Sequence, residues 1–121
     1  NLSPTVLRLG DVDRSRALLR EAVELAEDFG HTLLLAHSLA VAAELAAVDG
    51  DRALAMKLVG ATEAAFAALA GQLPEGERLA FERIRSRVGD VDPAWQEEGR
   101  GWLLADALAT ARPLFMAPAS A

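Results

Sequence analysis

One apolar stretch, residues 33–48 (LLLAHSLAVAAELAAV), constrains the fold of this chain more than any other feature. Its only polar side chains are His37, Ser38 and Glu44. A helix that is apolar on nearly all sides must be covered on most of them by other parts of the protein. We therefore expect this stretch to form the central helix of the fold, with the other helices packed around it.

The composition favours helices throughout. Hydrophobic residues make up 52% of the 121 residues, whereas aromatic residues make up only 5%. Ala is abundant and β-branched residues are sparse, which favours helices over strands. This length suits one domain with a real core. We predict an all-α chain with a single domain over residues 1–112 and a flexible tail over 113–121.

Capping and turn-forming residues divide the chain into about six helices. Gly10 is expected to end a short lead-in, after which Asp11 or Asp13 caps the first full helix. The pair Asp92-Pro93 is a strong start signal, and Pro113 is expected to end the last helix. The predicted helices are 13–29, 32–48, 51–70, 74–88, 93–98 and 102–111.

Three features inside these helices lead to packing predictions. The first helix has apolar residues at helical spacing, which predicts one buried stripe. Gly60 lies inside the third helix, where Gly costs about 1 kcal/mol relative to Ala, so we expect another helix to cross closely there. Gly99-Arg100-Gly101 is expected to be non-helical and to separate the fifth helix from the sixth. The stripe of the first helix consists of Leu18, Leu19, Ala22, Leu25, Ala26 and Phe29.

An internal repeat of forty residues is visible. Gly10-Asp11 and Gly50-Asp51 share this offset, as do Leu18-Leu19 and Leu58-Val59. Each unit reads as helix, short turn, helix, which is typical of antiparallel helical repeats. We predict a tetratricopeptide-like α-solenoid fragment, although the signature residues of an ideal 34-residue repeat are not all present.

Several classes of protein are disfavoured by what the sequence lacks. Without Cys, disulfides and thiolate metal sites are excluded, and a cytoplasmic location is expected. The net charge of −6 argues against direct contact with nucleic acid. His37 and Glu44 interrupt the longest apolar run before the roughly 18 residues of a membrane span, and no signal peptide is visible. Because the chain begins at Asn1 without Met, we expect a fragment of a longer polypeptide.

Four short motifs stand out, and they are Gly50-Asp51-Arg52-Ala53, Leu58-Val59-Gly60-Ala61, Leu73-Pro74-Glu75-Gly76-Glu77-Arg78 and Trp95-Gln96-Glu97-Glu98-Gly99-Arg100. The sequence is similar to the C-terminal helical-repeat region of large bacterial signalling ATPases of the LuxR type and of the antibiotic-regulator (SARP, AfsR-like) type. The resemblance covers about residues 7–111 and implies a sensor or interaction module of a transcriptional regulator. It carries over no catalytic residue, and neither a P-loop nor a helix-turn-helix with a basic recognition face is present.

The polar positions of the central stretch are the first candidate site. His37 and Glu44 are seven residues apart, so they share one helix face about 10 Å apart along the axis. They either line a groove for a ligand or peptide, together with Ser38, or form hydrogen bonds to a neighbouring helix. His31 and His37 are six apart, which does not suit a metal site on one helix face. Ser38 and His37 point about 100° apart, which suits no catalytic pair.

The second candidate site surrounds the predicted break near residue 100. Trp95 and Trp102 flank this break and, with Arg100, are candidate contacts for a partner. Closure of the core between the last two helices is the alternative role for both Trp side chains. Arg78, Arg83, Arg85 and Arg87 form a basic patch that suits either an acidic partner or pairing with nearby Glu residues.

We therefore expect a non-catalytic scaffold that binds a protein or peptide, including other domains of its own full-length chain. Self-association through exposed helix ends near Val6, Leu7 and Leu9 is a further expectation. The alternative is a small-molecule effector domain with an enclosed pocket at His37, Ser38 and Glu44. No catalytic, cofactor-binding or metal-binding residue is assigned.

Overall fold

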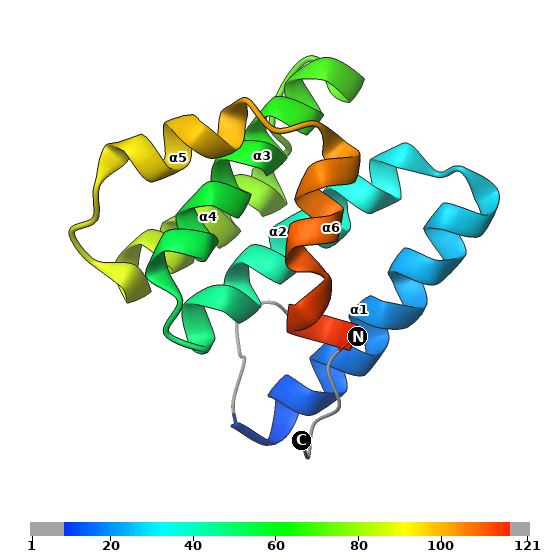
Figure 1. Cartoon of the computed structure of the whole chain (residues 1–121), viewed down its shortest axis with the longest axis horizontal. Coiled ribbons are helices and arrows are strands. Elements are labelled where there is room, and N and C mark those ends of the chain that lie inside the picture. Colours follow the sequence, from blue (N-terminus) through cyan, green and yellow to red (C-terminus); the bar gives the residue numbers. More distant parts are fainter. Residues whose placement is uncertain (1–8, 117–121) are drawn as a thin grey trace.

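The computed structural model describes residues 9–116, and this part of the chain consists of six helices without a strand (Figure 1). The predicted all-α class and number of helices are confirmed. Most predicted boundaries lie within two residues of the observed ones. The helices are α1 (Leu9–Phe29), α2 (Thr32–Val48), α3 (Arg52–Ala70), α4 (Glu75–Val88), α5 (Pro93–Arg100) and α6 (Leu104–Met116).

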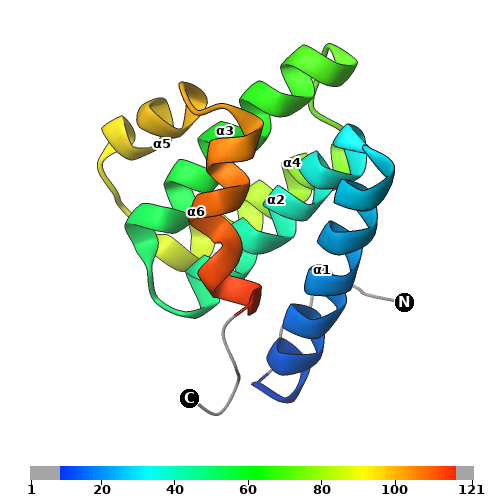
Figure 2. The ribbon, with the colours of Figure 1, turned by 45° about the vertical axis from the view of Figure 1, so that its right-hand side comes forward.

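Helix α2 is the centre of the fold, as its apolar sequence predicts. It contacts α1, α3, α4 and α6, and in Figure 2 these helices surround it. Eleven of its 17 residues are buried, and Leu39 and Leu45 are among the most buried side chains of the core. A two-residue turn at Gly30 joins α1 to α2, and a three-residue turn at Gly50 joins α2 to α3. Both glycines have the positive φ that such turns require.

The predicted forty-residue repeat is matched only in part. Gly50 and Asp51 lie in the turn and at the cap before α3, whereas their counterparts Gly10 and Asp11 lie inside α1. Side chains of α2 pair with those of α4 at separations of 40 residues (His37 to Glu77) and 39 residues (Glu44 to Arg83). Later residues of α2 therefore meet later residues of α4, so these two helices run parallel, as equivalent helices of successive repeats do. Asp51 caps α3, because its carboxylate accepts a hydrogen bond from the Leu54 N–H at 3.1 Å.

Helix α6 closes the chain onto its beginning. It contacts α1 and α2 as well as α3, whereas in an open array each helix contacts only its near neighbours in sequence. Arg16 of α1 donates hydrogen bonds to the Leu114 carbonyl of α6 and to Asp49 at the end of α2. This one side chain therefore joins three helices.

The prediction that Pro113 ends the last helix is wrong. Helix α6 includes Pro113 and continues to Met116, and Leu114 and Phe115 are buried in the core. Burial of these two side chains outweighs the loss of one backbone hydrogen bond at the proline. The domain therefore extends beyond residue 112, and residues 117–121 of the predicted tail lie outside the described residues.

The beginning of α1 also differs from the prediction. The helix starts at Leu9 and passes through Gly10, so neither Asp11 nor Asp13 is a cap. The short lead-in helix and the apolar residues Val6 and Leu7 lie outside the described residues.

The predicted stripe of α1 is only partly buried. Leu19 and Ala26 are in the core, together with Val12 and Val23, whereas Leu18, Leu25 and Phe29 are exposed. The apolar part of α1 is wider than the surface that α2 and α6 cover.

Two glycines bring α3 and α5 into close contact. A Cβ atom on Gly60 would lie 2.9 Å from the Arg100 nitrogen and closer still to the Gln96 carbonyl oxygen. A Cβ atom on Gly99 would clash with the Lys57 carbonyl. The close crossing predicted at Gly60 is therefore confirmed. Gly99 does not break the helix but belongs to α5, which ends at Arg100 with Gly101 as its C-cap.

Candidate functional site

His37 and Ser38 both have partners within the protein. The His37 ring nitrogen Nδ1 lies 2.7 Å from the Glu77 carboxylate of α4, and the ring packs edge-on against Phe66, with 4.9 Å between centroids. The buried Ser38 hydroxyl donates to the Leu34 carbonyl of its own helix at 2.9 Å. The Ser38 hydroxyl therefore bonds within its own helix and the His37 Nδ1 atom bonds to α4, whereas the His37 side chain remains 41% exposed.

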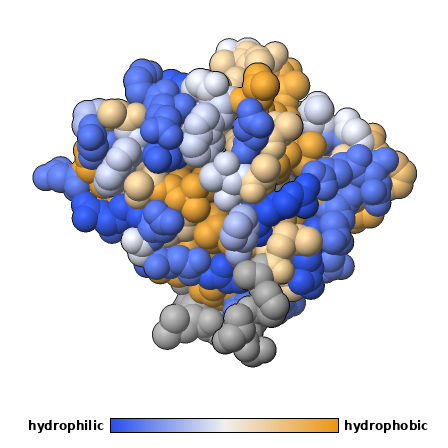
Figure 3. All heavy atoms as spheres, viewed as in Figure 1, coloured by the Kyte–Doolittle hydropathy of each residue, from blue (hydrophilic) through white to orange (hydrophobic). Residues whose placement is uncertain are grey.

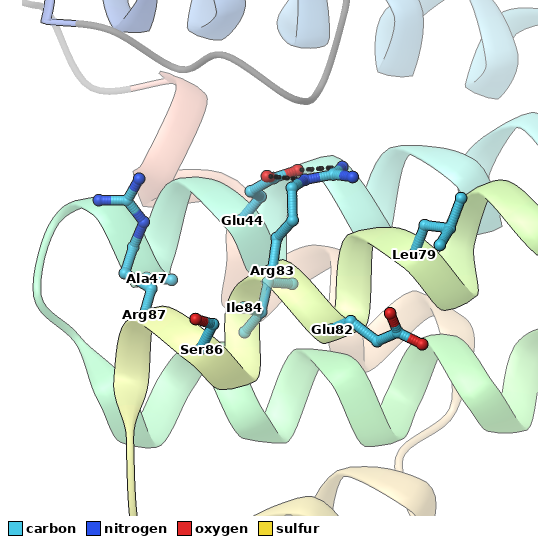
Figure 4. Close-up of a pocket in the computed structure, with 8 residues that line it drawn as sticks. All are labelled: Glu44, Ala47, Leu79, Glu82, Arg83, Ile84, Ser86 and Arg87. Carbon is cyan, nitrogen blue, oxygen red and sulfur yellow. Dashed lines mark hydrogen bonds and ion pairs between the residues drawn. The ribbon is translucent and has the colours of Figure 1, made fainter.

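Glu44 is the one buried carboxylate of α2, and Arg83 of α4 neutralises it. The Arg83 Nε and Nη2 atoms donate to its two oxygens at 3.0 Å and 3.4 Å. Figure 4 shows Arg83 reaching across to Glu44, whereas Glu82 points away from this pair. Such a two-point contact is the strong form of an ion pair, and it fixes α4 against α2.

An open groove lies beside this pair. It has a volume of about 660 Å³ and is open to solvent along its length. Arg87 lines it one turn beyond Arg83, and exposed Leu79 lines it one turn before (Figure 4). The small-molecule alternative requires an enclosed pocket at His37, Ser38 and Glu44. Here these side chains instead form the seam between α2 and α4 or bond to their own helix.

Trp95 and Arg100 hold α5 on α3. Trp95 is partly buried against the core. Arg100 donates to Glu63 of α3 at 3.1 Å and to Glu97 of its own helix at 2.8 Å. The hydrogen bond to Glu97 and the charge of Glu63 raise the pKa of Arg100 above its usual value. Trp95 is therefore part of the packing of the core, on a helix that contacts α3.

Trp102 also packs partly against the core and, in addition, lines an apolar pocket between α3 and the beginning of α6. We call this the α3–α6 pocket. Its volume is about 220 Å³, and all of its lining residues are apolar. Leu103 and Leu69 at its edge are 72% and 44% exposed. Figure 3 shows apolar side chains gathered over the C-terminal end of α3, at the top of the view. The lining residues are Ala61, Ala64, Ala65, Ala68, Leu69, Trp102, Leu103 and Leu104.

Sequence reasoning found one residue of this pocket, Trp102, and missed the rest. Of the Ala residues of α3 that line it, Ala61 is buried and only Ala68 is exposed, and their helical spacing also describes an ordinary packed helix. Leu103 was assigned to the body of the last helix, but α6 begins at Leu104 and leaves Leu103 in the preceding turn. The signal that could have found the pocket is the run Trp102-Leu103-Leu104 directly after a glycine.

Within residues 9–116, no group of three or more His, Cys, Asp or Glu side chains is placed to hold a metal ion. One described helix, α3, is long and apolar enough by length and composition to cross a membrane. The sequence prediction had considered only residues 33–48 for this role. Because α3 packs against α2 and α5 and buries Leu58, Val59 and Phe66, its place in the core accounts for its composition.

No protein-family model, curated protein or solved structure matches this chain. The resemblance of its motifs to bacterial regulators therefore stays a prediction.

Proposed function

We propose that this chain is a non-catalytic interaction module that binds a partner protein or peptide through the α3–α6 pocket. The observation that carries the proposal is an entirely apolar pocket with large apolar side chains exposed at its edge. On the basis of the motif resemblance, we also propose that the module is part of a bacterial transcriptional regulator in the cytoplasm.

The size of the pocket favours a side chain over a free small molecule. Its volume of about 220 Å³ is below the range of about 300–1,000 Å³ that is common for small-molecule sites. It is large enough for one Leu, Met or aromatic side chain. Anchors of this kind, seated in an apolar pocket, contribute much of the affinity at protein interfaces.

The residues that form the pocket suit such an anchor. The Ala side chains of α3 make a shallow floor, because they leave room that larger residues would fill. Trp102 supplies a rigid aromatic wall, and Leu103 extends the apolar surface outward. Aromatic residues are enriched at the energetic centres of interfaces.

The small-molecule alternative has less support. Glu44 is paired with Arg83, and the Ser38 hydroxyl is bonded within α2. A charged effector at this position would have to replace the Arg83 contact. The groove beside Glu44 is also open, so it would bury little of a ligand.

The proposal is tested by selecting ligands from a displayed library of random twelve-residue peptides. The selected peptides are then titrated against the wild-type chain, Leu103→Ser and Leu79→Ser. Leu79 is the matched control, because it is equally apolar, is also exposed and lines the other groove. We expect selected peptides to share one bulky apolar residue, and Leu103→Ser to weaken their binding at least tenfold.

Equal binding to Leu103→Ser and the wild type would contradict the proposed site, as would loss of binding in Leu79→Ser alone. If no peptide were enriched over repeated selections, the proposed peptide-binding function itself would be contradicted. Circular dichroism of both variants checks that the fold is retained.

A further inference from the structure

A second apolar surface runs along α1, independent of the α3–α6 pocket. Leu18, Leu25 and Phe29 are 39%, 55% and 81% exposed, and Ala22 lies between them, half-buried. At about 100° per residue, these four positions fall within an arc of about 60° on the helix. We call them the α1 outer stripe. Figure 3 shows apolar atoms at the right-hand edge, where α1 turns into α2.

The α1 outer stripe is continuous with the core. On the helical wheel it borders the positions of Ser15, Leu19 and Ala26, which are all buried. With Val12 and Val23, which are also buried, this continuous arc of α1 spans about 160°, and the other helices of the chain cover only about one half of it. A partner on the exposed half would extend an interface that the fold already makes.

Charges mark the other border of the stripe. Glu21 and Asp28 are exposed there, one heptad apart, which is about 10 Å along the helix. Exposed Arg14 lies on the same line one heptad before Glu21, beyond the first residue of the stripe, Leu18, so the border beside the stripe itself is acidic. Among residues 9–116, the ion pairs of α1 use Arg16 and Glu27, which lie on the side facing away from this border. The acidic border is therefore available to a partner with positive charge.

We infer that the α1 outer stripe binds an amphipathic helix of a partner protein, with Lys or Arg residues about seven positions apart along one edge. Apolar residues at positions i, i+4, i+7 and i+11 form a ridge that another helix can pack against. A second copy of this chain fits less well, because it would bring the same acidic border and a net charge of −6.

Two designed peptides test this inference directly. Each is a helix of about twenty residues with the same Leu/Ala stripe, and they differ only at two edge positions seven apart, which are Lys in one and Glu in the other. We expect the Lys-edged peptide to bind the wild type at least tenfold more tightly at low salt. This preference should shrink at about 1 M salt, where charges are screened within about 3 Å.

Variants locate the site. Leu25→Ser is expected to weaken binding of both peptides at least tenfold, whereas Leu79→Ser, at an exposed Leu of α4, is expected to leave it unchanged. Replacing Glu21→Gln and Asp28→Asn together should remove the preference for Lys while keeping the apolar binding. All four positions are exposed, so the fold should tolerate these changes.

Three results would overturn the inference. The first is no binding of either peptide, and the second is equal binding of the Lys-edged and Glu-edged forms at low salt. The third is a wild-type dimer in light scattering that Leu25→Ser converts to a monomer, because the stripe would then serve a second copy of the chain.

Discussion

At the scale of single residues, the contact between α3 and α5 depends on two atoms that are absent, the Cβ atoms of Gly60 and Gly99. We predict that Gly99→Ala lowers the free energy of unfolding by at least about 2 kcal/mol, because the new Cβ would overlap the Lys57 carbonyl and force the helices apart. Urea denaturation followed by circular dichroism measures the change.

Gly76 provides the matched control for this prediction. It also lies inside a helix, but no atom is within 4 Å of where its Cβ would be. Gly76→Ala should leave stability unchanged or raise it by up to about 1 kcal/mol, because Ala restricts the unfolded chain more than Gly does. If both variants were equally stable, the close crossing of α3 and α5 would be wrong.

A second prediction at this scale concerns the buried carboxylate of Glu44. Replacing Arg83→Ala leaves this charge without its partner, so we expect a loss of about 1–3 kcal/mol in unfolding free energy. Arg87→Ala, one turn away in the same groove, should change stability by less than about 0.5 kcal/mol, because Arg87 is exposed. Thermal denaturation of the two variants side by side distinguishes them; similar losses would mean that the Glu44–Arg83 pair does not stabilise the fold.

The polar residues of the central stretch show where sequence reasoning stops. The sequence shows that His37, Ser38 and Glu44 interrupt an apolar helix and that His37 and Glu44 share a face. Their partners Glu77 and Arg83 are about forty residues away, and several Glu and Arg residues of that region are equally plausible partners. Only the packing of α4 on α2 selects among them.

At the scale of whole elements, α6 is held in place by its last turn. Phe115 is 2% exposed and belongs to the core, although Pro113 precedes it. We predict that Phe115→Ala lowers the free energy of unfolding by about 3–5 kcal/mol, as for other buried aromatic residues. Met116→Ala, the neighbouring exposed position, should cost less than about 1 kcal/mol. Equal stability of Phe115→Ala and the wild type would show that the chain after Pro113 is not part of the core.

The boundaries of elements were well predicted where a cap or turn residue decides them. Asp92 caps α5 through the Ala94 N–H, as Asp92-Pro93 indicates. At both Gly10 and Pro113 a helix continues through a residue with low helix propensity, and at Pro113 the burial of Leu114 and Phe115 accounts for it. Helix propensity does not include the free energy of burying Phe115, which here exceeds the cost of the missing N–H donor at Pro113.

At the scale of the whole molecule, the sequence predicts that α2 lies at the centre of the fold, but it does not predict that α6 packs against α1. An apolar helix flanked by two short turns must lie inside, and its forty-residue relation to α4 predicts a repeat. The return of α6 to α1 depends on contacts such as Arg16 with Leu114, about a hundred residues apart. No periodicity in the sequence encodes this contact, and it also determines which half of α1 stays exposed.

The central claim is that the α3–α6 pocket receives an apolar side chain of a partner. The most direct measurement is a map of backbone amide chemical shifts for the ¹⁵N-labelled chain, titrated with a peptide from the selection described above. We predict that the largest changes fall at Ala65, Ala68, Leu103 and the Trp102 indole. Changes centred on Glu44 and Arg87, or spread evenly over the helices, would contradict the claim.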